Sequence, residues 1–305
     1  MDLFTSILLV LGNADGKSHA LKKAVALAKK NKARIRIVDV FSDEISPDIL
    51  PALVRERASV LEELASGLGR EGISARAEVL TGIPFIEIIR AVSKGGHDLV
   101  IKDAEGRPGI RERIFGSTDL HLFRKCPCRV WIYRPTARSR ISSILAPVDP
   151  DPFNQERNRL NYSILHHAAI IAREEGARLY IVNAWDFFAE NLLRVRNSLN
   201  FKDVDVMVRE THLQYKERLN SLLKECEYDL KGIDHEVHLL KGNAGDIIPV
   251  FARKSKVELI VMGTIARTGV PGFFVGNTAE LILNRVNSSV LALKPEGFAS
   301  PVPSL

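Results

Sequence analysis

The chain has 305 residues, enough for about two domains of ordinary size, and its 46% hydrophobic and 26% charged residues are close to the averages of globular proteins. No segment approaches the roughly 18 consecutive apolar residues of a membrane-spanning helix, and Met1 to Phe4 show neither the basic lead nor the cleavage site of a signal peptide. Three cysteines are too few for a secreted disulfide framework. We therefore expect a cytoplasmic protein that does not associate with membranes.

The net charge of +6 lies mainly in residues 1–137, which hold 22 Lys and Arg against 17 Asp and Glu. Several of these basic residues are close together in the sequence: Arg107, Arg111, Arg113, Arg124, Lys125 and Arg129. Such a cluster can attract polyanions, but no aromatic residues lie between its members to stack on bases. A solvent-facing surface is favoured, and a nucleic-acid partner is unlikely on this pattern.

The first half alternates short apolar segments with segments of helical period. Strands are expected at 4–11, 35–41, 75–80, 99–102 and 129–133, and helices at 18–30, 49–69 and 84–92. Strands that alternate with helices predict a parallel sheet covered on both faces.

The second half repeats the first. Thr81-Gly82-Ile83-Pro84 corresponds to Lys241-Gly242-Asn243-Ala244 at an offset of 160 positions, and His97–Ile101 corresponds to 257–261 at the same offset. Toward the start of each copy the offset falls to 144 and then 137, so the second copy carries insertions of 16 and 7 residues. We expect two domains, at 1–137 and 138–305, joined by a short linker at 135–140. The predicted fold class is α/β, with two tandem doubly wound five-stranded parallel sheets.

A glycine-rich loop follows the fourth strand of the second copy. It begins at Gly263, continues through Gly269 and ends at Gly276, where a helical pattern starts with Asn277 and Thr278. Glycines let backbone N–H groups approach a phosphate closely, and a helix N-terminus adds partial positive charge. The same pattern also fits a tight turn with an N-cap and no ligand. Both interpretations are open on the residues alone.

This loop resembles that of the ATP-binding universal stress proteins. They have Gly, two residues, Gly, nine residues, Gly and then Ser or Thr, with an Asp after the first strand that contacts the nucleoside. Asp149, Gly263 and Gly276 match, while Ala266 replaces the second glycine and Asn277 the hydroxyl residue, with Thr278 next to it. The resemblance implies an adenine nucleotide alpha hydrolase-like fold and ATP bound in the second copy by Asp149, Gly263, Ala266, Gly269, Gly276, Asn277 and Thr278.

The first copy departs from the same pattern. Asp103 stands where the first glycine belongs, and the first strand ends in Leu11-Gly12-Asn13 with no acid. A carboxylate that faces a phosphate is repulsive unless a cation intervenes. We expect the first copy to have lost nucleotide binding.

Two short segments resemble the tandem E-type members of this family: Phe115-Gly116-Ser117-Thr118 and Gly276-Asn277-Thr278-Ala279-Glu280. Single-domain members commonly dimerise through their last strands. The resemblance therefore implies an intramolecular pseudo-dimer in which 129–133 and 289–293 lie side by side, which would hide two sheet edges. Further homo-oligomers are left open.

The resemblance implies a stress-response binding protein. Slow ATP hydrolysis occurs in the family, but no Gly-x-Ser-x-Gly motif is present. Cys126-Pro127-Cys128 lacks a second ligand pair, so no metal is predicted. An alternative function is a carrier of an apolar or lipid-like metabolite, because residues 185–193 are unusually apolar for a connection. That segment also fits a core cover or a subunit contact.

Overall fold

The computed structural model describes residues 3–12, 18–105, 115–134, 140–188, 190–195, 201–264 and 276–303. Outside these ranges fall the predictions for Asn13, Arg107, Arg111, Arg113, Ala189, Ala266, Gly269 and most of the predicted linker. The chain divides into two compact units. The first contains Met1–Ser139, Thr264–Gly276 and Ser289–Leu305, and the second contains Arg140–Gly263 and Asn277–Ser288.

The first unit contains the five strands predicted for the first copy. Its elements are β1 (Ser6–Val10), α1 (His19–Asn31), β2 (Arg34–Phe41), α2 (Leu50–Arg70), β3 (Ala75–Thr81), α3 (Pro84–Gly95), β4 (Leu99–Asp103), α4 (Ser117–Lys125), β5 (Arg129–Tyr133) and β10 (Ser289–Leu293). The strand order is β3-β2-β1-β4-β5-β10, and the first five strands are parallel. The predicted doubly wound parallel fold is confirmed.

The last strand of the second copy lies beside the last strand of the first. β10 pairs with β5 in antiparallel register, with Leu291 opposite Trp131 and Val290 opposite Ile132. This confirms the predicted contact between the two segments. The pairing satisfies the edge of β5, which would otherwise present unpaired N–H and C=O groups.

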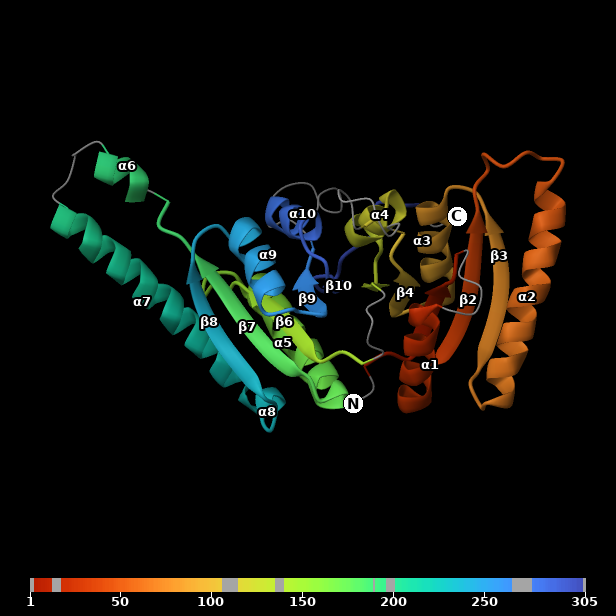
Figure 1. The fold of residues 1–305 in the computed structure, drawn as a ribbon, viewed down its shortest axis with the longest axis horizontal. Helices are drawn as coiled ribbons and strands as arrows, with labels where there is room; N and C mark the ends of the chain where they lie inside the picture. Colours follow the sequence, from red (N-terminus) through yellow and green to blue (C-terminus); the bar gives the residue numbers. More distant parts are fainter. Residues whose placement is uncertain are drawn as a thin grey trace. The chain divides into compact units, whose positions relative to one another are not determined.

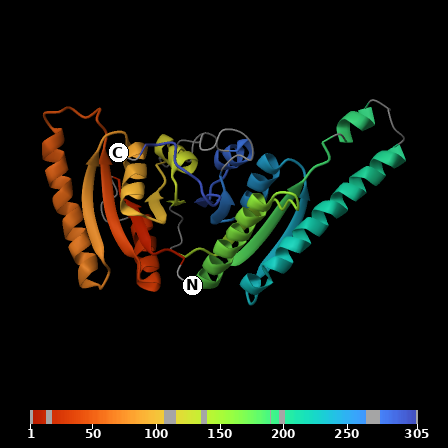
Figure 2. The same cartoon turned by 180° about the vertical axis from the view of Figure 1, so that it is seen from behind.

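Burial of this sheet follows from the helices on its two faces. Figures 1 and 2 show β2 and β3 between α3 on one side and α2 on the other. All five residues of β1 and of β10 are buried, whereas the residues of β3 are half-buried or exposed. Central strands covered on both faces need continuous apolar sequence, which explains why the first segment of the chain shows no alternation.

The second unit repeats this arrangement with longer connections. Its elements are β6 (Ser143–Val148), α5 (Gln155–Glu175), β7 (Arg178–Trp185), α6 (Glu190–Val195), α7 (Phe201–Glu225), α8 (Glu227–Leu230), β8 (His235–Lys241), α9 (Ala244–Lys254), β9 (Leu259–Gly263) and α10 (Asn277–Leu283). The strands β9-β6-β7-β8 lie in that order and pair in parallel. Figures 1 and 2 show β7 and β8 between α7 and α9.

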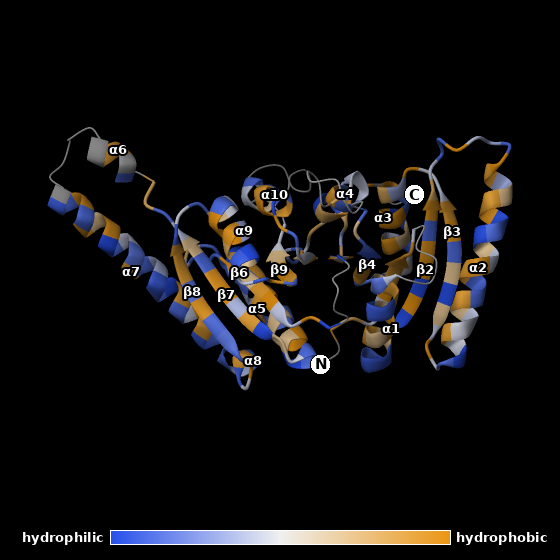
Figure 3. Cartoon of the chain, viewed as in Figure 1, coloured by the Kyte–Doolittle hydropathy of each residue, from blue (hydrophilic) through white to orange (hydrophobic). Residues whose placement is uncertain are grey.

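Local sequence explains where α5 begins and ends. Asn154 caps α5 by accepting a hydrogen bond from the N–H of Arg157, and Gly176 ends it with φ of 58°. The helices α2 and α7 mix hydrophilic and hydrophobic residues along their length, as Figure 3 shows. This is typical of helices that cover a sheet with one face. Among the described residues, none of the helices is both long and apolar enough to cross a membrane.

Candidate functional site

Asp149 and Gly263 lie at the same edge of the second unit. β6 ends at Val148, directly before Asp149, and β9 ends at Gly263. The two strands are parallel neighbours, with Ile144 opposite Leu259. Their carboxyl ends therefore open onto one edge, where ligands of open α/β sheets bind.

Helix α5 supports both residues from adjacent positions. The Asn161 side-chain oxygen accepts a hydrogen bond from the N–H of Asp149 at 3.0 Å. Leu160 packs against Gly263 so closely that a Cβ atom there would lie 2.7 Å from Leu160 Cδ2. A larger residue at Gly263 would force the Leu160 side chain to shift. Packing therefore favours a small residue at this position, independently of any ligand.

A cation faces the carboxylate of Asp149. Nη1 of Arg157 lies 3.8 Å from Asp149 Oδ2 and 2.9 Å from Asp151 Oδ2. The Asp149 side chain keeps 33% of its surface exposed. This edge of the sheet therefore presents both an anionic acceptor and a guanidinium donor to an incoming polar molecule.

Three buried polar atoms at this edge have no hydrogen-bond partner within the described part of the chain. They are Nδ2 of Asn161, Oδ1 of Asn183 and Nε of Arg157. Asn183 is fully buried on β7, opposite Val148, whose carbonyl accepts its amide N–H at 2.8 Å. A buried polar group without a partner costs about 1–3 kcal/mol, and such atoms call for a water or a ligand.

The remaining predicted residues are placed separately. Gly276 belongs to the first compact unit, and its N–H donates to the carbonyl of Thr264 at 3.3 Å. Asn277 and Thr278 are the first residues of α10 in the second unit, and both are exposed. Ala266 and Gly269 lie outside the described residues. Asp149 and Gly263 lie at the ends of two paired strands, and Gly276 is bonded to the residue that follows Gly263.

The matching edge of the first unit is occupied by an arginine. Asp39 on β2 corresponds to Asn183, and Gly12 corresponds to Asp149. Arg57 from α2 donates Nε to Asp39 Oδ2 at 2.7 Å and Nη2 to the carbonyl of Gly12. The guanidinium group therefore spans the positions that Asn183 and Asp149 hold in the second unit.

Two carboxylates accept the donors that a ligand would use in the first unit. Ser18 is the N-cap of α1, and Asp103 accepts hydrogen bonds from Ser18 Oγ at 2.5 Å and from the N–H of Ala20 at 3.0 Å, so it supplements the cap. Asp103 therefore stabilises the start of a helix, which explains an acid where the family pattern has glycine.

Asp119 does the same at the start of α4. It is fully buried and accepts hydrogen bonds from the N–H groups of Glu105 at 3.1 Å and Gly116 at 3.0 Å, as well as from Lys102 Nζ. Burial opposes the charge of Lys102, but Asp119 and Glu105 outweigh it and raise the pKa of that lysine. The N–H groups of Glu105 and Gly116 and the ammonium group of Lys102 are thus paired with Asp119 from within the chain.

Sequence reasoning missed Arg57, Asn161 and Asn183. Asn183 carried a usable signal, because an amide in the apolar strand segment Ile181–Trp185 must be hydrogen-bonded or face a ligand. Arg57 carried none, since it lies 45 residues from Gly12 on a long charged helix.

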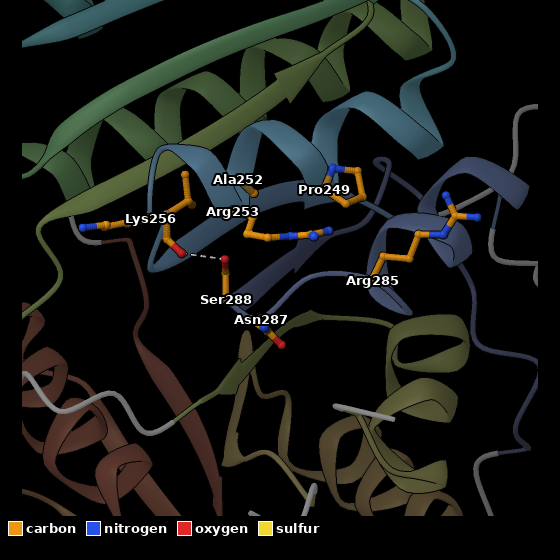
Figure 4. Close-up of a pocket in the computed structure, with 8 residues that line it drawn as sticks. Pro249, Ala252, Arg253, Lys256, Arg285, Asn287 and Ser288 are labelled. Carbon is orange, nitrogen blue, oxygen red and sulfur yellow. Dashed lines mark hydrogen bonds between the residues drawn. The ribbon is translucent and has the colours of Figure 1, made fainter. Parts of the chain in front are cut away.

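A separate pocket of about 190 Å³ lies in the second unit between α9 and the segment before β10. Figure 4 shows Arg253, Lys256 and Arg285 around it, with Ser288 donating a hydrogen bond to the carbonyl of Val257 at 2.6 Å. Arg285 is paired with Asp246. None of the residues predicted for nucleotide binding lines this pocket.

The described residues of the apolar insert at 185–193 differ in burial. The Trp185 ring is buried against His212 and Tyr215 of α7, with centroid distances of 5.1 and 6.5 Å, and Lys241 lies over it. Phe188, in contrast, is 97% exposed. Trp185 therefore covers part of the core, which was the other interpretation of this segment. Phe188 projects into solvent.

Comparisons with known proteins agree with the two-copy architecture. The profile of the Universal stress protein family matches residues 4–134 and again 142–294. Universal stress protein E of Escherichia coli K12 is 28% identical over 99% of this chain and 98% of its own length. Universal stress protein E homolog of Haemophilus influenzae is 24% identical over 96% of this chain and 98% of its own length.

Among solved structures, a functionally unknown protein from Pseudomonas aeruginosa superposes with a TM-score of 0.75 and 27% identity, over 97% of this chain and 95% of that one. A universal stress protein from Archaeoglobus fulgidus gives a TM-score of 0.63 at 18% identity, over 95% of this chain and 96% of that one. The second likeness shows the fold.

Proposed function

Since this chain belongs to the universal stress protein family, we propose that its second copy binds an adenine nucleotide, ATP in the first instance, at the carboxyl edge of β6 and β9. The first copy does not bind it and serves as a structural partner. The protein acts in the cytoplasm as a ligand-dependent binding protein of the stress response. We assign no catalytic step to these residues.

The observation that carries the proposal is the contrast between matching positions. In the second copy, Asn161 and Asn183 are buried with one polar atom each that lacks a partner in the described part of the chain. In the first copy, the position of Asn183 is held by Asp39, which is paired with Arg57. Among the described residues, Asp39 of the first copy is therefore paired with a side chain of its own unit. Asn161 and Asn183 of the second copy each keep a polar atom that a ligand can use.

The chemistry of ATP complements the groups at the second edge. A nucleoside offers hydroxyl and amino donors, for which the carboxylate of Asp149 and Oδ1 of Asn183 are acceptors. Its ring nitrogens and phosphates accept hydrogen bonds, for which Asn161 Nδ2 and the Arg157 guanidinium are donors. The mixture of donors and acceptors favours a nucleotide over an inorganic anion.

Isothermal titration calorimetry of the full chain with ATP at up to millimolar concentration tests the proposal. We expect one site per chain. Asp149→Asn removes a charge-assisted hydrogen bond worth roughly 1.5–3 kcal/mol and should weaken binding about ten- to a hundredfold.

Asp234→Asn is the matched control, because Asp234 makes the same kind of ion pair with Arg178 but lies at the amino end of β8. It should leave ATP affinity unchanged. If the wild type gives neither heat nor a rise in melting temperature with ATP, the nucleotide proposal is wrong. Mass spectrometry of ligands released from the purified protein would then test the alternative of an apolar metabolite.

A further inference from the structure

Two cysteines meet at the junction of α4 and β5. Cys126 follows the last residue of α4, and Cys128 directly precedes β5, with Pro127 between them. Both are free thiols, and their Sγ atoms lie 3.6 Å apart. A disulfide bond requires about 2.05 Å, so the two sulfur atoms need to approach by roughly 1.5 Å.

The two thiols differ in access and in ionisation. Cys126 is fully buried, whereas Cys128 is half-buried and its Sγ donates to the carbonyl of Arg129 at 3.4 Å. Burial opposes ionisation of Cys126, but hydrogen bonds from Cys128 outweigh it and the Lys294 charge adds to them, so the pKa of Cys126 is lowered. The hydrogen bond from Cys126, together with burial, raises the pKa of Cys128. The pair thus holds one shared proton more loosely than an isolated buried thiol would.

Lys294 connects this pair to the start of the glycine-rich loop. It follows β10, and its ammonium group donates to the carbonyl of Phe123 in the last turn of α4 and to Thr264 Oγ1 at 2.9 Å. Thr264 Oγ1 also donates to the Phe123 carbonyl at 2.8 Å. Burial lowers the pKa of Lys294 to about 8, and the two nearby thiols counteract that effect.

We propose that Cys126 and Cys128 form a peroxide-reactive site whose two thiols are reversibly oxidised to a disulfide, and that Lys294 transmits this change to Phe123 and Thr264. The co-reactant is a hydroperoxide, with hydrogen peroxide as the simplest case. The oxidation does not rest on the proposed nucleotide binding, because none of these residues is among those assigned to the nucleotide.

The reaction balances as a two-electron oxidation. In the singly ionised pair, the proton that the two sulfur atoms share moves to Cys126, and the more exposed Cys128 attacks one oxygen of hydrogen peroxide as the thiolate. The O–O bond breaks, hydroxide leaves, and Cys128 becomes a sulfenic acid. The thiolate of Cys126 then attacks that sulfur, the S–O bond breaks, and a second hydroxide leaves. With the two thiol protons, the products are one disulfide and two waters. A small-molecule thiol reverses the reaction by thiol–disulfide exchange.

Oxidation changes the surroundings of Lys294. The disulfide carries no negative charge, so the effect that raises the pKa of Lys294 is removed. At neutral pH a larger share of the lysine then becomes neutral, and its hydrogen bonds to Phe123 and Thr264 weaken. Thr264 also accepts the N–H of Gly276 through its carbonyl, so the change reaches Gly276 as well.

The test uses the full chain and peptide mass spectrometry. The protein is treated with a few equivalents of hydrogen peroxide, blocked with an alkylating reagent under denaturing conditions and digested with trypsin. Cleavage after Lys125 and Arg129 isolates Cys126-Pro127-Cys128-Arg129. We expect the mass of this peptide to be two hydrogens below that of its dithiol form, with no alkyl group attached. After reduction and renewed alkylation, the peptide should carry two alkyl groups. Cys226, whose pKa burial raises to about 12, should stay alkylated and serves as the internal control.

Variants separate the two steps. Cys126→Ser should stop the reaction at a sulfenic acid on Cys128 that dimedone traps, and Cys226→Ser should react as the wild type does. Lys294→Met should slow oxidation at pH 7, roughly tenfold for each unit by which the pKa of the pair rises, and Lys294→Arg should restore most of the rate. A tetrapeptide that remains doubly alkylated in the wild type, or disulfides that form only between molecules, would overturn the proposal. Neither result depends on whether a variant folds.

Discussion

Asp119 offers the sharpest test of the view that the first crevice is closed by its own side chains. Replacing it with Ala removes the buried acceptor of the Lys102 ammonium, which keeps Glu105 Oε1 at 3.1 Å as its second partner, and leaves the N–H groups of Glu105 and Gly116 unpaired. Lys102 is 6% exposed, so it cannot recover hydration without local opening. Removing one partner of a buried pair costs about 3–5 kcal/mol. We expect Asp119→Ala to lower the free energy of unfolding of the first unit by that amount.

The assay is urea denaturation followed by tryptophan fluorescence. The chain has two tryptophans, Trp131 in the first unit and Trp185 in the second. In a Trp185→Phe background, the buried Trp131 reports on the first unit.

Lys29 and Glu71 provide the control, because they form an ion pair at 2.8 Å with side chains that are 52% and 54% exposed. Glu71→Ala should cost less than about 1 kcal/mol.

A double-mutant cycle completes the test. The cycle compares Lys102→Met, Asp119→Leu and the two together. The double variant removes both charges of the pair, so it should be more stable than Asp119→Leu alone by about 2 kcal/mol or more. The reasoning is refuted if Asp119→Ala costs no more than Glu71→Ala, or if the single effects simply add in the double variant.

Two further predictions concern the same unit. Burial, aided by the charges of Arg36 and Arg34, lowers the pKa of His97 to about 4, so between pH 6.5 and 4 the unfolded chain binds a proton that the folded chain does not. The free energy of unfolding should therefore fall by about 2 kcal/mol as the pH drops through this window, and His97→Gln should reduce that fall. A variant whose pH dependence equals that of the wild type would contradict this role of His97. Asp103→Ala should cost about 1–2 kcal/mol in the Trp131 assay by removing the acceptor at the start of α1, and no loss would show that Asp103 does not cap that helix.

The strands and their order could be predicted because they depend on local apolar runs and on the repeat. β1 and β4 are buried on both faces and read as continuous apolar segments, and the constant offset between copies transferred each assignment to the second half. The pairing of β5 with β10 followed from the family resemblance and from the unsatisfied edge of β5.

The interiors of the two crevices could not be predicted in the same way. Arg57 reaches Asp39 and Gly12 from α2, and no spacing in the sequence connects these three positions. Asp103 was interpreted as a carboxylate that faces a phosphate, whereas it accepts hydrogen bonds from Ser18 and Ala20 at the start of α1. Such contacts depend on side-chain direction in the folded state, which residue type alone does not determine.

Hydrogen exchange of the full chain with and without millimolar ATP tests the central claim most directly, because it locates binding in each copy separately. We expect ATP to protect amides in Asp149–Asn161 of the second unit and to leave Leu99–Glu105 and Phe115–Asp119 of the first unit unchanged. Protection of the two segments of the first unit, or of no segment at all, would contradict the account.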